Sequence, residues 1–120
     1  MKYIYVKFNV MVQAKTGLFE EQLVEAASLF KVLAHPARLK ILQFLSESET
    51  CITGDISEEL PLGRTTVNQH LKELKEFGLI QGRIEGSKTR YCLNPEKIKI
   101  VEQLASQFFQ TLDLKEYKCD

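Results

Sequence analysis

One arrangement constrains the fold more than any other: two helix-forming segments are joined by a turn of three residues, and a hairpin pattern follows directly. The turn is Pro61-Leu62-Gly63, a sequence that interrupts helices. In the segment after it, residues 64–77, apolar side chains recur every three or four positions, and Gly78 stands where a left-handed residue ends a helix. The apolar stripe consists of Val67, Leu71 and Leu74. So short a turn predicts two helices that pack closely together ahead of a β-hairpin.

The segment LIQGRIEGSKTRYCL, residues 79–93, predicts both the hairpin and its register. Glycine at the first position of a two-residue turn suits a type II′ connection, so we expect the chain to reverse at Gly86-Ser87. With that turn, the expected cross-strand pairs are Glu85 with Lys88, Ile84 with Thr89, Arg83 with Arg90, Gly82 with Tyr91, Gln81 with Cys92 and Ile80 with Leu93. One face of this hairpin is apolar and is expected to face the core.

Helical spacing predicts three further helices, over residues 18–33, 36–46 and 95–117, and a brief helix near residues 56–60. The last helix is the longest and reaches about 34 Å at 1.5 Å per residue. The expected inward residues are Phe19, Leu23, Ala26, Ala27, Phe30 and Leu33 in the first helix, Leu39, Ile41, Leu42 and Leu45 in the second, and Ile98, Val101, Leu104, Ala105, Phe108 and Leu112 in the last. The fold class is thus mainly α with a small β-hairpin. Its element order is that of a winged helix-turn-helix, whose helix after the turn enters the major groove of DNA.

The composition fits one domain, expected over residues 18–117, that resides in the cytoplasm. Hydrophobic residues make up 44% of the chain and charged residues 27%, and no stretch approaches the 18 or so apolar residues of a membrane span. No signal peptide is expected, because Lys7 interrupts the apolar N-terminus. Residues 1–17 are expected to form an N-terminal arm. Residues 1–10 alternate in polarity, and they form either a strand exchanged within a dimer or a loose arm ahead of a true start at Met11.

The formal net charge of zero speaks against a nucleic-acid partner, since proteins that bind phosphate backbones usually carry a basic excess. The charges are unevenly distributed, however, and residues 64–90 alone are positive. The basic side chains there are Arg64, Lys72, Lys75, Arg83, Lys88 and Arg90, against the acidic Glu73, Glu76 and Glu85. Positive charge therefore gathers on the helix after the turn and on the hairpin.

The outward residues of that helix suit contacts with DNA. Arg64 can donate two hydrogen bonds to guanine, and Asn68 and Gln69 can each pair with adenine. The two threonine methyl groups can touch thymine, the two lysines are placed for phosphates, and His70 is expected either to pack or to contact phosphate. The candidate DNA-contacting residues of this helix are Arg64, Thr65, Thr66, Asn68, Gln69, His70, Lys72 and Lys75. The alternative is an ordinary solvated face, but Thr and Asn are mediocre helix formers, which favours a functional role.

The hairpin supplies a second set of candidates for DNA contacts. Arg83 and Arg90 are expected to face each other on its outer side, and directly opposed like charges destabilise a sheet. A pair of residues that destabilises its own sheet suggests that the residues serve a function. With Ser87 and Lys88 near the tip, these residues can contact a phosphate or reach the minor groove, whereas the alternative is a solvated strand face. Glu85 is expected to neutralise Lys88 in part.

Three motifs resemble the ArsR family of winged-helix repressors: Pro-x-Arg-Leu-x-Ile-Leu at 36–42, His-Leu-x-x-Leu-x-x-x-Gly-Leu-Ile at 70–80, and Tyr-x-Leu at 91–93. The resemblance covers roughly residues 25–94. It implies a transcriptional regulator, expected to be a repressor, that binds double-stranded DNA as a homodimer at an inverted repeat, with half-sites about 34 Å apart. It also implies dimerisation through the first and last helices. The candidate interface residues are Phe19, Leu23, Val101, Leu104, Ala105, Phe108, Phe109 and Leu112.

The chain departs from the metal-sensing members of that family. Those members carry a paired-cysteine motif before the short helix, or histidines and carboxylates on the last helix. In this chain, the segment before the short helix contains only one cysteine, Cys51. Residues 95–120, which include the last helix, contain no histidine. Because a zinc site needs three or four converging ligands, neither a metal nor a cofactor is expected.

The three cysteines lack CxxC spacing, which argues against a disulfide framework and favours free thiols. If the short strand at Cys51 pairs with the second hairpin strand, however, Cys51 and Cys92 point to the same face. They then form a candidate thiol switch, the alternative being two inert small residues. A Cα separation above 7 Å would exclude a direct bridge. Cys119 lies near an end that is expected to fray.

Other functions have less support in the sequence. The motifs GxSxG, GxGxxG, HExxH and the P-loop are absent, so no enzyme is expected. A winged helix that serves as a protein-interaction module is the main alternative, and salt-dependent DNA binding distinguishes the two. Phe30, Phe108 and Phe109 either line a small-molecule pocket between the dimer helices or simply form core. The effector, whether a small molecule or a redox agent, and the operator sequence stay open.

Overall fold

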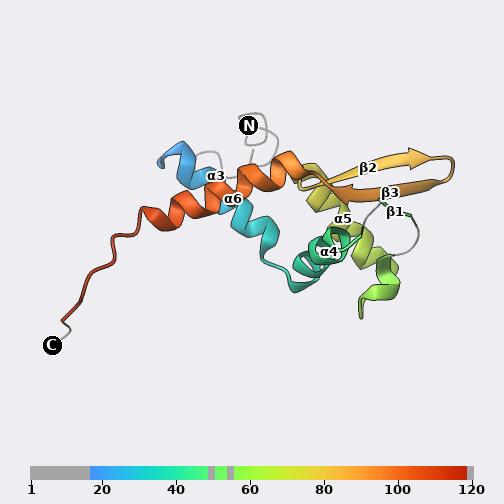
Figure 1. Ribbon diagram of the computed structural model, residues 1–120, viewed down its shortest axis with the longest axis horizontal. Helices are drawn as coiled ribbons and strands as arrows, with labels where there is room; N and C mark the ends of the chain where they lie inside the picture. Colours follow the sequence, from blue (N-terminus) through green and yellow to red (C-terminus); the bar gives the residue numbers. More distant parts are fainter. Residues whose placement is uncertain (1–16, 49–50, 54–55, 119–120) are drawn as a thin grey trace.

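The computed structural model describes residues 17–48, 51–53 and 56–118 (Figure 1). The expected N-terminal strand, the alternative start at Met11 and Cys119 all lie outside the described residues. The elements are α3 (Glu21–Leu33), α4 (Pro36–Ser46), β1 (Ile52–Thr53), the 3₁₀ helix η1 (Ile56–Glu59), α5 (Arg64–Phe77), β2 (Ile80–Glu85), β3 (Lys88–Leu93) and α6 (Pro95–Gln110). This order confirms the winged helix-turn-helix fold.

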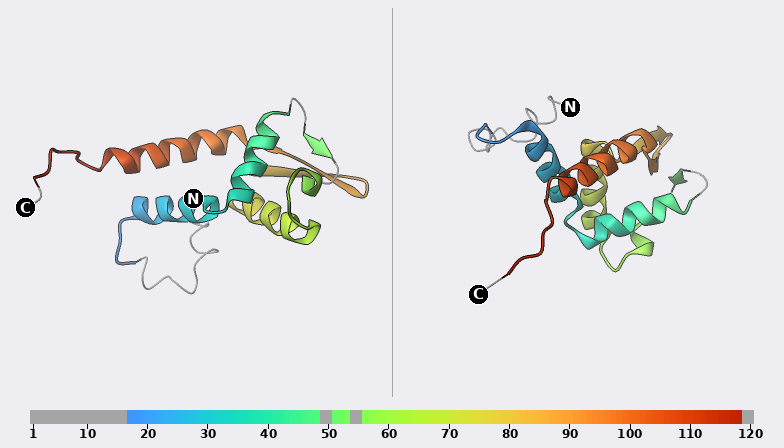
Figure 2. Two further views of the ribbon diagram at one scale, coloured as in Figure 1. Left: turned by 90° about the horizontal axis from the view of Figure 1, so that it is seen from below. Right: turned by 60° about the vertical axis from the view of Figure 1, so that its left-hand side comes forward.

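The helices divide into two groups. Helices α3 and α6 run side by side and project away from the remaining elements, which form a compact head of α4, α5 and the sheet (Figure 2). The hairpin of β2 and β3 extends from the opposite end of the head (Figure 1). The first and last helices of the described chain therefore share a surface at some distance from the hairpin tip.

The core of the head forms around the apolar stripe of α5. Val67, Leu71 and Leu74 are all buried, as their spacing predicts. They belong to one cluster that α3, α4, β2 and α6 complete. The most deeply buried large side chains are Leu29, Ile41, Leu74, Leu79 and Val67. Since the stripe of α5 lies on this cluster, the opposite side of α5 faces solvent.

Glycines mark both ends of α5. Gly63 is its N-cap, with an extended backbone (φ −71°, ψ 159°) and no side chain to accept a hydrogen bond. Gly78 follows the last turn with φ 100°, in the left-handed region. There the N–H of Leu79 donates to the carbonyl of Leu74, and that of Gly78 to the carbonyl of Lys75, which satisfies carbonyls at the helix end.

The sheet has three antiparallel strands in the order β1-β3-β2. All six predicted cross-strand pairs of the hairpin are present, including Arg83 opposite Arg90. Gly86 has φ 63°, and among the described residues positive φ is confined to glycines, so Ser87 has the negative φ that a type II′ turn requires. β1 pairs with β3, as the sequence analysis considered, with Ile52 opposite Tyr91.

Five residues that were predicted to face inward are exposed: Phe19, Leu23, Ala27, Leu39 and Leu112. The core side of α3 includes Leu29 and Val32, whereas Ala27 is exposed and Leu23 is 41% exposed. In α4, Leu39 is also exposed. Helix α3 carries apolar side chains on more than one face, so spacing alone does not decide which face meets the core. Of the predicted residues of α3, Ala26 is buried and Phe30 and Leu33 are half-buried against the core, so the predicted face overlaps the observed one only in part.

The last helix is shorter than expected, since α6 ends at Gln110 and spans 16 residues. The side-chain hydroxyl of Thr111 donates to the carbonyl of Phe108 at 2.6 Å, which satisfies a carbonyl of the last turn. Asp113 follows just beyond a helix C-terminus, where negative charge is unfavourable. Leu114 is 89% exposed, so no packing within the chain supports a longer helix.

The two glycines at the ends of α5 should respond oppositely to substitution. A Cβ at Gly63 meets no atom within 4 Å, so Gly63→Ser adds a capping hydroxyl and restricts the unfolded chain. We expect its free energy of unfolding to rise by about 0.5–1 kcal/mol. Gly78→Ala places a side chain at φ 100° and should lower it by about 1–2 kcal/mol. Urea denaturation measures both, and an unchanged Gly78→Ala protein contradicts this account of the helix end.

Candidate nucleic-acid interface

The solvent-facing side of α5 gathers polar and cationic side chains. Seven of the eight candidates on this helix are exposed: Arg64, Thr65, Thr66, Asn68, Gln69, Lys72 and Lys75. All of them lie outside the buried stripe, so burial of that stripe leaves them accessible to solvent. One of them has a partner within the helix, since Gln69 Nε2 donates to Glu73 Oε1 at 3.0 Å. This bond uses one of the two N–H groups of the Gln69 amide and leaves its acceptor oxygen out of the pair.

The eighth candidate, His70, lies elsewhere. It is half-buried and accepts a hydrogen bond at Nδ1 from Arg38 Nε, at 3.0 Å. Its ring also lies 5.4 Å from that of His35, between centroids. Of the two roles considered for His70, the structure thus provides the packing role. His70 connects α5 to α4.

Arg38 was not a candidate in the sequence analysis. Besides its bond to His70, its Nη1 donates to the carbonyl of Val32 at 3.1 Å. This one guanidinium therefore joins α3, α4 and α5. The Pro-x-Arg-Leu motif that contains Arg38 was the available signal, but its spacing did not indicate which groups the arginine contacts.

The environment of His70 favours its neutral form. Burial, followed by the positive charges of Arg38 and His35, lowers the pKa of His70, while Glu73 acts in the opposite direction. The hydrogen bond from Arg38 also requires a neutral imidazole, because Nδ1 can accept a hydrogen bond only when it carries no proton. The link between α4 and α5 is thus formed by a neutral imidazole.

The hairpin presents its candidates at and near the tip. Arg83, Ser87 and Lys88 are exposed, and Arg90 is half-buried. Arg90 Nη1 lies 3.5 Å from a carboxylate oxygen of Glu85. Glu85 therefore pairs diagonally with Arg90, while the register also places it directly opposite Lys88. This pairing offsets part of the repulsion between the two opposed arginines.

One lysine places its charge between the helix and the hairpin. A Cβ built at Gly82 would lie 3.1 Å from the amino nitrogen of Lys75, so the lysine side chain crosses close over strand β2. A side chain at this position would force the end of Lys75 to shift by a few tenths of an ångström. Lys75 of α5 therefore lies next to the hairpin. We call the exposed cationic side chains of α5 and of the hairpin, taken together, the basic surface.

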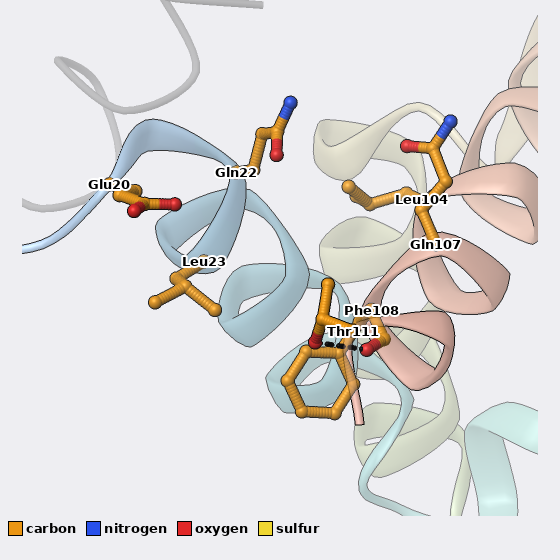
Figure 3. A pocket seen from close by; sticks show the side chains of 7 residues that line it. All are labelled: Glu20, Gln22, Leu23, Leu104, Gln107, Phe108 and Thr111. Atoms are coloured by element: carbon orange, nitrogen blue, oxygen red, sulfur yellow. Dashed lines mark hydrogen bonds between the residues drawn. The ribbon is translucent and has the colours of Figure 1, made fainter. Parts of the chain in front are cut away.

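A second surface, at the free ends of α3 and α6, is apolar. Phe30 packs edge-on against Phe108 at 5.8 Å between ring centroids, and Phe109 lies 6.1 Å from Phe30. A shallow pocket nearby is lined in part by Leu23, Leu104 and Phe108 (Figure 3). The three phenylalanines thus contact one another, and only Phe108 among them lines this pocket.

The eight candidates for the dimer interface separate by burial. Phe19 (62%), Leu23 (41%), Phe109 (61%) and Leu112 (49%) are exposed large apolar residues. Leu104, Ala105 and Phe108 are half-buried between the two helices. Val101 is buried in the core of its own chain, so it supports this surface from beneath. We call the exposed and half-buried members the α3–α6 surface.

Nowhere in ranges 17–48, 51–53 and 56–118 do three His, Cys, Asp or Glu side chains gather where they could hold a metal ion. In the same ranges, no helix is both long and apolar enough to cross a bilayer.

A helix-turn-helix followed by a hairpin, with a polar and cationic face left open, defines a winged-helix regulator that binds DNA. Comparison with known proteins agrees. The sequence profile of bacterial regulatory proteins of the arsR family matches residues 35–81. An uncharacterised HTH-type transcriptional regulator of Methanocaldococcus jannaschii is 31% identical over 87 residues, which span 72% of this chain and 98% of that protein.

Two further relatives have named roles. The arsenical resistance operon repressor of Staphylococcus xylosus is 35% identical over 79 residues, 66% of this chain and 75% of the repressor. The transcriptional activator HlyU of Vibrio cholerae is 30% identical over 90 residues, 75% of this chain and 82% of HlyU. A solved structure of HlyU superimposes with a TM-score of 0.57 at 31% identity, covering 77% of this chain and all of that one. The chain belongs to the arsR family.

Protonation of His70 should weaken the fold. Because its pKa is lowered in the folded state, the unfolded chain binds the proton more readily, and the stabilisation is present above about pH 6.5 and lost as the pH falls below that value. We expect the free energy of urea unfolding to decrease between pH 7.5 and pH 5.5. His70→Asn offers Arg38 an oxygen that does not titrate, so its decrease should be smaller. An equal decrease in both proteins would assign the pH dependence to other groups.

Proposed function

We propose that this regulator binds operator DNA as a homodimer and represses transcription by occupying a promoter. One observation carries the proposal: α5 buries its whole apolar stripe and leaves seven polar or cationic candidates exposed to solvent. A helix of this kind fits the major groove, where side chains reach base edges. Since a DNA-binding protein acts where the chromosome lies, we propose the cytoplasm as its location.

In this proposal, the residues of α5 divide between two roles. Arg64, Asn68 and Gln69 contact base edges, because their side chains can form bidentate hydrogen bonds to guanine or adenine. Thr65 and Thr66 pack their methyl groups against thymine. Lys72 and Lys75 bind phosphates and set the position of the helix without reading sequence. His70 acts indirectly, because it fixes α5 against α4 through Arg38.

The hairpin contacts the flanking backbone in this proposal. Arg83, Ser87 and Lys88 are exposed and need no rearrangement to meet phosphate oxygens. Arg90 must exchange the carboxylate of Glu85 for a phosphate. The exchange is feasible because an ion pair between partly exposed groups contributes only about 0–1 kcal/mol.

The α3–α6 surface is the proposed dimer interface. Four large apolar side chains stay exposed there, although the chain has a complete core elsewhere. Contiguous apolar surface on a soluble domain is typical of an interface. A second copy related by a twofold axis covers each surface with the same surface of its mate and sets the two α5 helices over an inverted repeat, about 34 Å apart.

The direction of regulation is proposed from a relative, and the possible effector site is considered from the position of the pocket. Repression is proposed because the Staphylococcus xylosus relative is a repressor, although HlyU is an activator. The pocket at Leu23 and Phe108 falls within the α3–α6 surface, where the proposed second copy covers it. We therefore assign no small-molecule effector to that pocket.

The two roles in α5 predict different effects of substitution. Asn68→Ala should relax base preference at one operator position, with a loss of about 1–3 kcal/mol on the preferred sequence. Lys72→Ala should weaken binding to all sequences alike. It should also lower, by about one, the magnitude of the slope of log binding constant against log salt concentration. Binding is measured by fluorescence anisotropy on DNA selected from genomic fragments, over a range of salt concentrations.

Gln103→Glu, on an exposed part of α6, is the control for this experiment. If Asn68→Ala and Lys72→Ala act identically, the division between base and phosphate contacts is wrong. If the unaltered protein selects no DNA and shows no salt-dependent binding, the chain is a protein-interaction module instead.

The proposed dimer interface is tested by a charge placed on the α3–α6 surface. Phe109→Glu introduces a carboxylate on a side chain that is 61% exposed, so we expect the dissociation constant of the dimer to rise at least tenfold while the helical circular dichroism persists. Gln103→Glu adds the same charge to a different face of α6 and should leave the dimer intact. Sedimentation velocity measures the oligomeric state. A Phe109→Glu protein that stays dimeric excludes this surface as the interface.

A further inference from the structure

The pairing of β1 with β3 brings two thiols together. Ile52 lies opposite Tyr91 and Thr53 opposite Arg90, so one step back along β1 places Cys51 opposite Cys92. Directly opposed residues of antiparallel strands have Cα atoms about 4.5–5.5 Å apart. A disulfide spans Cα separations of about 4.4–6.8 Å. The register therefore meets the distance requirement without a change of backbone.

The two side chains also interact. A hydrogen bond with Cys51 is the largest cause that raises the pKa of Cys92, and burial raises it further, while the positive charge of Arg83 acts in the opposite direction. Cys92 therefore persists as a thiol. Both cysteines are half-buried and reduced, so small reagents can reach them from solvent.

The thiols lie on the same face of the sheet as Arg83 and Arg90 of the hairpin, which is the wing of the winged-helix fold. Side chains alternate along a strand, so Cys92 and Arg90 point to the same side of β3, as does Arg83 from the opposing position of β2. The apolar residues Tyr91 and Leu93 point to the other side, where they pack against the core. The thiol pair thus lies on the outer face of the sheet, beside the basic surface.

We propose that Cys51 and Cys92 are a modification site: a hydroperoxide oxidises them to an intramolecular disulfide that cross-links β1 to the wing strand β3. The sulfur of Cys51, as thiolate, attacks one peroxide oxygen, the O–O bond breaks, and Cys51 becomes a sulfenic acid while hydroxide or an alkoxide leaves. The sulfur of Cys92 then attacks the Cys51 sulfur, and the Cys92 proton leaves with the displaced hydroxyl as water. The peroxide is reduced by two electrons and the two thiols lose them.

The bond has consequences for the DNA-binding part of the chain. It closes a loop from Cys51 to Cys92 that contains all of α5 and β2. It also fixes the strand from which Arg90, two residues away, must leave Glu85 to reach a phosphate. Oxidation therefore stiffens the wing and opposes that exchange. This effect on DNA rests on the proposed function, whereas formation of the bond does not.

The test uses the full chain with Cys119→Ser, which removes the third thiol. After treatment with hydrogen peroxide, we expect the intact mass to decrease by two hydrogens, the protein to show no new disulfide-linked dimer, and Tm to rise by about 10 °C or more. Dithiothreitol should reverse all changes. Adding Cys51→Ser or Cys92→Ser should abolish the rise in Tm, and the Cys92→Ser protein should instead accumulate a dimedone-reactive sulfenic acid at Cys51.

Two outcomes overturn the inference. Oxidation that stops at separate sulfinic or sulfonic acids, or that yields only bonds between chains, excludes the intramolecular pair. Equal operator affinity of reduced and oxidised protein excludes the effect on the wing, for which we expect at least threefold weaker binding after oxidation. Failure of the reduced protein to bind any DNA counts against the proposed function and leaves the disulfide to be judged by mass and Tm.

Discussion

Burial of the apolar stripe of α5 is the interaction on which the rest of the structure depends. Complete burial of a side chain such as Leu74 or Leu71 stabilises the fold by about 1.5–3 kcal/mol. A pair on the exposed side, such as Gln69 with Glu73, contributes only about 0.2–0.5 kcal/mol. The stripe therefore sets the rotation of the helix about its axis. The polar side chains are exposed because turning them inward would expose the apolar stripe to water.

A hydrogen-bonded link supplements this packing where three helices meet. Arg38 binds the C-terminal part of α3 through the carbonyl of Val32 and binds α5 through His70. The helix that exposes the basic surface is thereby tied to a helix of the α3–α6 surface. Since the proposed dimer needs a fixed spacing between its two α5 helices, a stiff connection between these surfaces is a physical requirement of that proposal.

The zero net charge of the chain is compatible with DNA binding because charge acts locally. The excess of cations is confined to α5 and the hairpin, and Lys75 of α5 lies close to Gly82 of β2. Few acidic groups enter this region, and Glu85 is paired with Arg90. A phosphate at the basic surface would interact mainly with these neighbours, since charges more than about 10 Å away are screened by salt.

The sequence by itself determined the local features: the register of the hairpin, the stripe and C-terminal glycine of α5, and the order of elements. Each follows from spacing or from a backbone requirement within a few residues, as the type II′ turn at Gly86 illustrates. Only the tertiary structure decided which face of α3 meets the core, where α6 ends, and that His70 packs under Arg38. Those outcomes depend on residues that are distant in the chain. The residues next to an apolar helix face or a polar side chain do not determine which distant residues it will contact.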